Sequence, residues 1–386
     1  MNFWGYKRPD GRVGIRNHIL ILPASVCATD TCRIVSEQVT GTVTFHNQNG
    51  CSQTPLDLKY TMDVMAGFAA NPNIYGIVAI SLGCEGAQMD MLVKEIRKRT
   101  NKPLKTLIIQ EVGGTIKTAE KAVRYASKMV EEASMLRKEE FPVSKLIVGT
   151  ECGGSDPTSG LAANNVVGEL SDRLVELGST SILSETTELI GAEHILAKRV
   201  KDETVKNRIY EIIERYENNL HAVGQRLRNA NPSPGNITGG LTTIEEKSLG
   251  CIHKGGHTDI QEVVDYAQET TQKGLIIMDT PGNDPASIAG MVAGGAQIVV
   301  FTTGRGTPTG NPIAPVIKIT GNKITYKKMI DNIDFDASAI IYGEATLEEL
   351  GDKLLKEVIA VANGKVTKAE ALNFMEIGMM RTCNYV

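Results

Sequence analysis

The sequence predicts an α/β protein with two or more Rossmann-like lobes, in which mostly parallel sheets are covered by helices. Its 386 residues allow two or three domains, because a domain usually holds roughly 100–200 residues. Short apolar runs rich in β-branched residues alternate with longer segments of helical period, which is the pattern of strands alternating with helices. Most of these runs are apolar at every position, as expected for strands covered on both faces.

The predicted strands follow one another along the whole chain. Polar or glycine-rich segments come after most of them, and such segments typically end a strand. We expect strands at residues 18–23, 42–46, 75–82, 105–110, 145–149, 181–184, 274–278, 297–302 and 316–320.

Helix starts are indicated by capping patterns. Thr54 followed by Pro55 is typical of an N-cap and a first helical position, and Pro72 closes that helix. Residues 243–246 and 258–261 each fit the capping box, in which a Thr is followed three residues later by Glu or Gln. Both patterns predict that a helix begins there.

The charged stretch 128–142 is the predicted domain boundary. It separates an N-terminal α/β lobe, residues 1–140, from a C-terminal α/β region, residues 141–386. That second region contains a long helical block near residues 193–230, which is apolar at helical intervals and highly charged elsewhere. This pattern predicts a long surface helix or a helical pair.

Composition excludes several classes of protein. The formal net charge is −4, whereas a nucleic-acid-binding protein usually carries a concentrated basic stripe. No segment has the ~18 uninterrupted apolar residues of a membrane-spanning helix, and the first 12 residues lack the apolar core of a signal peptide. We therefore expect a cytoplasmic protein that binds neither nucleic acid nor membrane. In that compartment seven scattered cysteines indicate reduced thiols or metal ligands rather than disulfides.

The 38 glycines gather in loops that follow predicted strands. In open α/β sheets, ligands bind outside the carboxyl ends of the strands, and glycine lets the backbone approach a ligand closely. Convergence of these loops predicts one polar pocket for a small oxygen-rich molecule. The loops span residues 46–54, 81–88, 149–160, 184–194, 279–285 and 302–312.

Three of these loops place a cysteine beside glycine, at Cys51, Cys84 and Cys152. Thiolates from separate strand ends can meet as ligands of iron or zinc, with Glu85 and Glu151 as alternative ligands. The sequence has no CxxC motif, so the other interpretation is that these are small buried apolar residues.

Two further clusters could supply acid–base groups. Lys254 lies between His253 and His257, and Glu185 and Glu188 precede Glu193 and His194. Helix capping and helix-dipole interactions are the alternative explanation for His257 and Glu193.

Nucleotide-binding motifs are missing, because neither GxxxxGK[ST] nor a helix-opening GxGxxG occurs. Gly304, Arg305 and Gly306 follow a predicted strand, but the next residues, Thr307 and Pro308, block a receiving helix. This turn is therefore predicted to present the Arg305 guanidinium to a carboxylate or another anion.

Several long motifs resemble one known family. They include GYKRPDGRVGIRN (5–17), SLGCEG (81–86), VGTECGGSDPTSGLAAN (148–164), LSETTELIGAEH (183–194), NPSPGNITGGLTTIEEKSLG (231–250), MDTPGNDP (278–285) and VAGGAQIVVFTTGRGT (292–307). Together they resemble the large catalytic portion of the altronate/galactarate dehydratase family. The large subunit of sulfolactate sulfo-lyase is in the same family. The resemblance covers nearly the whole chain.

Membership of that family implies a metal-dependent, usually iron-stimulated, lyase that acts on a hydroxylated acid. We expect Fe²⁺, with Mn²⁺ or an iron–sulfur cluster as alternatives. Full-length members that act on sugar acids carry a small SAF-type domain before the GYKRPDGRVGIRN motif, where this chain starts. The resemblance thus implies either a separately encoded small SAF-domain subunit or a large subunit that is incomplete alone. We also expect a homo-oligomer. Family members often have a His where this chain has Asn47, with His46 one position earlier.

The resemblance also suggests roles for the clusters. Lys254, His257 or His194 would be the base, with Glu193 beside them. Asn283 and Arg305 would hold the substrate. The segment formed by Asp156, Thr158 and Ser159 precedes a predicted helix, whose N-terminus can receive substrate oxygens.

Three functions remain open at this stage. The first is a hydro-lyase that converts an altronate-like aldonate or an aldarate to a 2-keto-3-deoxy acid. The second is the large subunit of a sulfolactate sulfo-lyase that releases sulfite. The third, from another class, is an iron–sulfur redox or binding protein.

Overall fold

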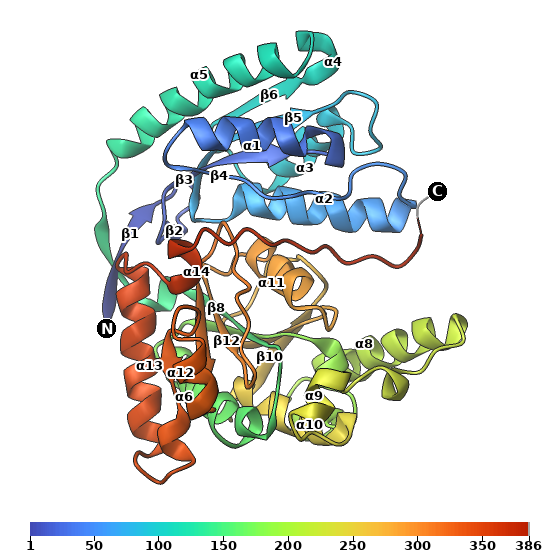
Figure 1. The fold of residues 1–386 in the computed structure, drawn as a ribbon, viewed down its shortest axis with the longest axis vertical. Coiled ribbons are helices and arrows are strands. Elements are labelled where there is room, and N and C mark those ends of the chain that lie inside the picture. The colour runs from blue at the N-terminus through green and yellow to red at the C-terminus, as the bar shows by residue number, and fades with distance from the viewer. Residues whose placement is uncertain (385–386) are drawn as a thin grey trace.

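The computed structural model describes residues 1–384, which form two stacked lobes (Figure 1). Each lobe contains a parallel sheet with helices on both faces, so the predicted α/β class with mostly parallel sheets is confirmed. A small antiparallel sheet lies beside the junction of the lobes. It consists of β2 (Val13–Gly14), β1 (Asn2–Lys7) and β7 (Glu139–Pro142).

The N-terminal lobe contains a four-stranded parallel sheet. Leu20 and Leu22 face one side of this sheet and Ile19 and Ile21 face the other, because successive side chains of a strand alternate. Helices α2 (Pro55–Ala70) and α3 (Met89–Arg99) cover the first side, and α1 (Thr29–Gln38) and α5 (Thr115–Ser134) cover the second. The strand order is β4 (Thr42–Val43), β3 (His18–Pro23), β5 (Ile74–Ser81) and β6 (Leu104–Ile108), after which the short α4 (Ile109–Val112) precedes α5.

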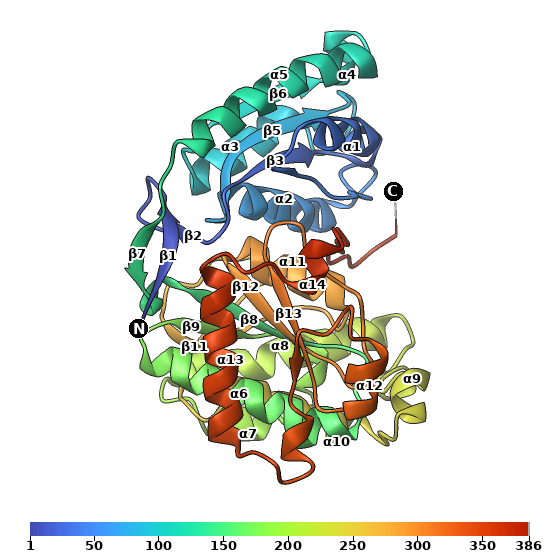
Figure 2. The ribbon, with the colours of Figure 1, turned by 60° about the vertical axis from the view of Figure 1, so that its left-hand side comes forward.

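The C-terminal lobe contains a seven-stranded parallel sheet. Val148 and Val300 face the layer of α6 (Asn164–Glu176) and α13 (Leu347–Ala362), which lie side by side in Figure 2. Val299 faces the opposite layer, α11 (Asp284–Ala293). The strand order is β10 (Ile260–Val264), β11 (Gly274–Met278), β9 (Thr180–Leu183), β8 (Ile147–Cys152), β12 (Ile298–Thr302), β13 (Val316–Thr320) and β14 (Phe335–Asp336).

Helix α2 joins the two lobes. It begins as predicted, with the Thr54 side chain accepting a hydrogen bond from the backbone of Asp57 and with Pro55 in the first turn. A Cβ atom on Gly67 would lie 2.4 Å from the carbonyl oxygen of Ala293. Because only glycine permits this approach, α2 packs closely against α11, and one apolar core runs through both lobes.

The last described residues also tie the lobes together. After α14 (Lys368–Ala371) the chain runs between the lobes, as the dark red segment of Figure 1 shows. The backbone N–H of Met380 donates to the Tyr266 hydroxyl of the C-terminal lobe at 3.3 Å. Thr382 donates to Asp57 of α2 through its backbone N–H at 2.6 Å and its hydroxyl at 2.9 Å.

Two predicted local features were wrong, and one small sheet was missed. The capping pattern at 258–261 does not start a helix, because Ile260 enters β10 and pairs with Leu275 of β11. The strand predicted at 42–46 ends at Val43, where pairing with β3 stops. Strands β1 and β7 were not predicted at all, because two segments more than a hundred residues apart form them by pairing with each other.

The expected helical block contains α7 (Glu193–Ala197) and α8 (Glu203–Ala222). Figure 1 shows α8 projecting from one side of the C-terminal lobe. Within residues 1–384, none of the helices has the length and apolar character required to span a bilayer.

The order of the strands creates a switch point. From β8 the chain continues through α6 to β9 on one side, whereas β12 pairs with β8 on the other side. Loops that leave a parallel sheet in opposite directions open a crevice at the carboxyl ends of the strands. The residues at the end of β8 therefore lie where ligands bind in folds of this kind.

Candidate active site

Strand β8 ends with Glu151 and Cys152, whose side chains point to opposite faces of the sheet because they are neighbours in a strand. Each belongs to a group of buried side chains. Cys152 lies with Glu188 and Cys251, and Glu151 lies with Glu185 and Asp284. Within each group, one potential ligand atom per residue lies within 4.8 Å of those of the other two. The residues come from the turn after β9, from the start of α11, and from the end of α10 (Ile244–Cys251).

The first group contains two thiols around one carboxylate. The sulfur atoms of Cys152 and Cys251 are 3.4 Å apart. Both thiols donate to Glu188 Oε2 at 2.7 Å. All three residues are buried, so this group is shielded from bulk water.

Two lysines surround the first group. Lys254 is fully buried, and its Nζ donates to Cys152 Sγ at 2.6 Å and to Glu185 Oε2 at 3.2 Å. Burial alone would lower the pKa of Lys254, but the facing thiol and carboxylate groups raise it well above its usual value. Lys247 lies 2.5 Å from Glu188 Oε1. Burial tends to raise the pKa of Glu188, but Lys247 and Lys254 outweigh it and lower this pKa to about 2. Glu188 is thus ionised and both lysines are charged.

The second group contains carboxylates only. Glu151 Oε2 accepts hydrogen bonds from Ser184 at 3.0 Å and from Ser287 at 2.6 Å. Its other oxygen, Oε1, is buried and has no hydrogen-bond partner within the described residues. Burial, reinforced by Glu185 and Asp284, raises the pKa of Glu151 well above its usual value. Burial and the Glu185 and Glu188 charges raise the pKa of Asp284 to about 7.

Glu185 connects the two groups. Its backbone has φ of +68°, a left-handed conformation that is unfavourable for a residue with a Cβ atom. Hydrogen bonds hold it in place: its N–H donates to Thr280 Oγ1 at 2.7 Å, and its Oε2 accepts from the Cys152 N–H at 3.0 Å, from the Cys152 thiol at 3.1 Å and from Lys254. Strain of this kind is usually kept where a side chain must be aimed at a functional site.

The donor set of the first group fits a soft divalent metal. Thiolates with one carboxylate favour iron or zinc, and Glu188 is already ionised. An iron–sulfur cluster usually takes four cysteines, whereas this group offers two. The second group has only oxygen donors, which suit Mn²⁺, Mg²⁺ or Ca²⁺. Among residues 1–384, one of these donors, the buried Glu151 Oε1, has no hydrogen-bond partner.

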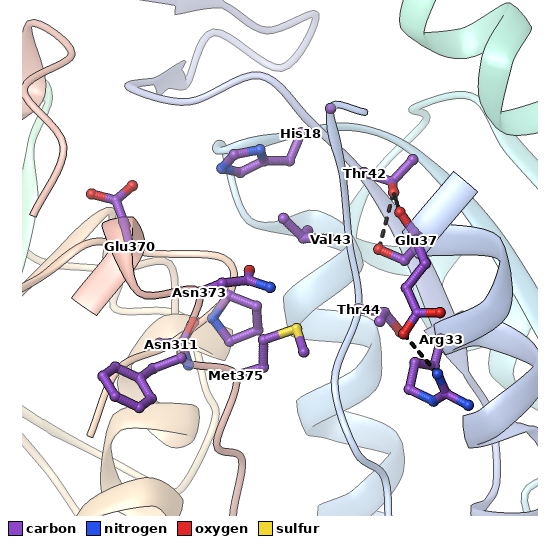
Figure 3. Close-up of a pocket in the computed structure, with 14 residues that line it drawn as sticks. His18, Arg33, Glu37, Thr42, Val43, Thr44, Asn311, Glu370, Asn373 and Met375 are labelled. Carbon is purple, nitrogen blue, oxygen red and sulfur yellow. Dashed lines mark hydrogen bonds and ion pairs between the residues drawn. The ribbon is translucent and has the colours of Figure 1, made fainter. Parts of the chain in front are cut away.

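A cavity of about 380 Å³ lies between the lobes, and none of the residues of the two groups lines it. We call the two groups and the two lysines beside them the cluster. Figure 3 shows that Arg33 and Glu37, on its wall, face each other in an ion pair. Glu370 is paired with Arg16. The charged groups of this cavity are therefore already neutralised, and none of them belongs to the two groups described above.

A second cavity, of about 310 Å³, opens beside the first group. Cys251 and Lys247 form part of its wall, together with Asp156, Ser159 and the exposed Leu161. Its size matches a small organic acid, and it leads from the surface to the buried Cys251.

The structure brings together some of the predicted metal ligands. Cys152 lies in the first group and Glu151 in the second. Cys51 and Cys84 lie in loops of the N-terminal lobe, outside both groups. Glu85 is buried there and accepts a hydrogen bond from the backbone N–H of Gly83 at 2.6 Å.

The predicted substrate-binding residues have different surroundings. Asp156 and Ser159 line the 310 Å³ cavity. Thr158 donates to Asp156 Oδ1 from its backbone N–H at 2.9 Å. Asn283 caps α11, next to Asp284. Arg305 is exposed and donates to the carbonyl oxygen of Gly235 at 2.6 Å.

Of the predicted acid–base residues, Lys254 is in the cluster and the others are not. His194 is exposed, and Glu193 accepts a hydrogen bond from the N–H of Gly191 at 2.6 Å. His257 is exposed, and its ring lies 3.2 Å from Asp172.

Sequence reasoning gave no role to Cys251, Lys247 or Asp284. Lys247 and Cys251 are four residues apart on α10 and therefore share one helix face, and Lys254 follows three residues later. This spacing was the available signal. Asp284 had none, because its carboxylate meets Glu151 only through the packing of α11 on β8.

The fold and the two buried groups define an α/β protein in which thiol, carboxylate and lysine side chains meet at the switch point of a parallel sheet. Two family models match the chain: D-galactarate dehydratase/altronate hydrolase, second domain, over residues 5–134, and D-galactarate/altronate dehydratase, C-terminal, over residues 143–384. The chain belongs to the altronate/galactarate dehydratase family, and it is a lyase of the dehydratase class.

Curated relatives include both dehydratases and a sulfo-lyase subunit. The (2R)-sulfolactate sulfo-lyase subunit beta of Chromohalobacter salexigens is 38% identical over 98% of this chain and 97% of that protein. The altronate dehydratase of Bacillus subtilis is 33% identical over 98% of this chain and 78% of its own length. The galactarate dehydratase (L-threo-forming) of Escherichia coli is 39% identical over 76% of this chain and 57% of that protein.

Proposed function

We propose that this chain is a metal-dependent hydro-lyase that dehydrates a sugar acid, an altronate-like aldonate or an aldarate, to a 2-keto-3-deoxy acid. One observation carries the proposal: the buried Cys152, Glu188 and Cys251 side chains meet beside a cavity of about 310 Å³. Cys152, Glu188 and Cys251 would hold Fe²⁺, since thiolates favour such a metal. Mn²⁺ is the alternative.

Dehydration of a 2,3-dihydroxy acid has two difficult parts. A weakly acidic proton beside a carboxylate must be removed, and a hydroxyl, which is a poor leaving group, must depart. The bound metal would supply Lewis-acid stabilisation of the negative charge that develops on the substrate. The protein's own side chains must then move the two protons.

Lys254 is protonated at neutral pH, because the facing thiol and carboxylate groups raise its pKa. A protonated lysine cannot accept a proton from the substrate, but it can donate one. We therefore assign Lys254 the role of acid toward the departing hydroxyl, in place of the base expected from the sequence. The base is assigned to Asp284, whose pKa of about 7 lets it accept a proton near neutral pH. Glu185, which lies between them, holds Lys254 in place.

The cavity supplies groups for the rest of the substrate. Ser159 accepts a hydrogen bond from the N–H of Asp156 at 3.3 Å, so its hydroxyl proton is free to bind a substrate oxygen. Lys247 reaches the same cavity and supplies positive charge near a substrate carboxylate.

The test is anaerobic incubation of the purified chain with ferrous iron under reducing conditions and a panel of aldonates, aldarates and sulfolactate, each with and without a small SAF-domain protein. Formation of a 2-keto-3-deoxy acid from at least one substrate is expected. If no substrate turns over in any combination, including sulfolactate, the lyase proposal is wrong. Release of sulfite instead of a keto-deoxy acid would exclude the hydro-lyase in favour of the following alternative.

A second candidate is the large subunit of a sulfolactate sulfo-lyase. One observation favours it: this chain spans 97% of a sulfo-lyase subunit beta but 78% of the Bacillus altronate dehydratase. The name of that relative, subunit beta, indicates that it works with another subunit. We propose that this chain has a small partner of the SAF type. Sulfite is a better leaving group than hydroxide, so Lys254 would act mainly through its charge. In the same experiment, this candidate predicts sulfite release from sulfolactate only when the small protein is present.

A further inference from the structure

Cys152 and Cys251 are suited to react with each other. Their sulfur atoms are 3.4 Å apart, and both thiols are free. A disulfide needs an S–S bond of about 2.05 Å, which a small adjustment of two side chains can reach. No other pair of thiols in residues 1–384 makes such a contact, although Cys27, Cys84 and Cys383 are more exposed.

One of the two thiols is open to a small oxidant. Cys251 forms part of the wall of the 310 Å³ cavity, whereas Cys152 does not line it. A peroxide molecule is not much larger than water and can enter a cavity of this size. The two thiols therefore differ in access, and Cys251 is the first to meet an oxidant that enters through the cavity.

We propose that Cys251 is an oxidative modification site: a small peroxide oxidises Cys251, and Cys152 then closes a disulfide with it. In the first step the Cys251 sulfur attacks one peroxide oxygen and the O–O bond breaks. Hydrogen peroxide thereby gives a sulfenic acid at Cys251 and one molecule of water. In the second step the Cys152 sulfur attacks the Cys251 sulfur, the S–O bond breaks, and a second water leaves. Two thiols are oxidised and one hydrogen peroxide is reduced to two waters.

Glu188 provides the proton path for the second step. Its Oε2 accepts hydrogen bonds from both thiols at 2.7 Å. The proton that leaves the Cys152 thiol can therefore pass through this oxygen to the hydroxide that departs from Cys251. Lys247 and Lys254 remain as counter-charges to the carboxylates after both thiols are consumed.

The consequence for function rests on the proposed metal site. A disulfide removes two of the three donors of the first group, because neither sulfur can then act as a thiolate ligand. Peroxide would switch off metal loading reversibly, and a dithiol reductant would restore it. Bound metal would in turn protect both sulfurs from oxidation. Bond formation itself does not depend on the lyase proposal.

The test uses the full chain, treated with a chelator and exposed to hydrogen peroxide in small molar excess. Free thiols are then blocked with N-ethylmaleimide, and the digest is mapped by mass spectrometry without reduction. The expected product is one linked peptide pair containing Cys152 and Cys251, which dithiothreitol separates. Cys27→Ser serves as the matched control and should give the same linked pair. In Cys152→Ser the first step still occurs, so a dimedone adduct should accumulate at Cys251.

The oxidation site and its effect on metal binding would be overturned by different outcomes. If Cys251 is oxidised to sulfinic acid in the wild-type chain without linkage to Cys152, or if Cys84 or Cys383 reacts while Cys251 stays reduced, the modification site is wrong. If the disulfide forms but iron content measured by mass spectrometry does not fall, the disulfide stands and the proposed metal ligands are wrong. Because the linkage is read covalently in metal-free protein, it can be found even if the chain shows no lyase activity.

Discussion

Lys254 Nζ lies 2.6 Å from Cys152 Sγ, and both side chains are buried. An ammonium group is costly to bury unless opposite charge and hydrogen bonds compensate it. Here Glu185 provides that compensation. Lys254, Cys152 and Glu185 thus place a positive charge, a sulfur atom and a carboxylate together in a volume with little water. Electrostatic interactions are strong in such surroundings.

Replacing Lys254 should impair the reaction more than the fold. In Lys254→Met the side chain keeps most of its volume but loses its proton and charge. We expect kcat to fall by roughly 10²–10⁴-fold, the usual effect of losing a general acid or base. Steady-state kinetics with the best substrate of the panel would measure this. Lys201→Met is the control, because Lys201 is exposed and pairs only with Asp259; an equal loss of kcat in both variants would contradict the role of Lys254.

Iron content should distinguish the cysteines. Cys152→Ser and Cys251→Ser each remove a donor of the first group, so iron affinity should fall by roughly tenfold or more, at least as much as when a residue supporting a metal ligand is lost. Cys51→Ser and Cys84→Ser lie outside that group and should retain iron. Mass-spectrometric metal analysis after dialysis provides the measurement. Loss of iron in the Cys51 and Cys84 variants alone would place the metal in the N-terminal lobe instead.

Asp284 should make stability depend on pH. Its pKa is about 7 in the folded chain and about 3.9 when unfolded, so the folded state binds more protons between these values. Its contribution to the free energy of unfolding is therefore greatest below pH 4, falls as pH rises toward 7, and is lost above pH 7. At roughly 1.4 kcal/mol per pKa unit, the total is on the order of a few kcal/mol.

Asp284→Asn removes this titration. Denaturant unfolding of the chelator-treated protein should show the variant to be more stable than the wild type at pH 8, and the difference should shrink toward pH 4. Asp30→Asn, on the exposed face of α1, is the control and should change neither the stability at pH 8 nor its dependence on pH. A pH-independent difference would show that Asp284 is not held in the neutral form.

The attachment of the C-terminal segment to α2 should depend on Asp57. Asp57 is fully buried, and its two oxygens accept hydrogen bonds from Thr382 and from the N–H of Cys383. In Asp57→Asn an NH₂ group replaces one of the two accepting oxygens and faces a backbone N–H that also donates. We therefore expect the free energy of unfolding to fall by about 1–3 kcal/mol. The segment should also become sensitive to carboxypeptidase, followed by intact-mass measurement. Unchanged resistance to the protease would show that the apolar contacts of residues 377–380 are sufficient.

Much of the fold follows from local sequence. Strands such as β3, β11 and β13 have the predicted bounds, because short runs rich in apolar and β-branched residues fit strands that are covered on both faces. Strand β10 was mistaken for a helix start at Thr258. There the capping pattern is satisfied locally, but pairing with β11 decides the structure. Local chemistry at Thr258 cannot reveal a partner strand that begins at Gly274.

The site divides in the same way. Glycine-rich loops after strands, a lysine in CIHKGGH and cysteines beside glycine were visible in the sequence, and they pointed to Cys152, Glu151 and Lys254. Which cysteine faces Cys152 was not visible. Cys51 and Cys84 have the more suggestive neighbours, yet Cys251 is the thiol that lies 3.4 Å away.

The sequence by itself determined the α/β class and the family, and it predicted a site at the carboxyl ends of the strands with cysteine, carboxylate and lysine side chains. Those properties depend on the order and spacing of residues that are close together in the sequence. Only the tertiary structure decided which thiol, which lysines and which carboxylates share one buried volume. Cys251 of α10 meets Cys152, and Asp284 of α11 meets Glu151, at the two faces of one strand end. There the facing thiols and carboxylates keep Lys254 charged, and burial together with Glu185 and Glu188 raises the pKa of Asp284.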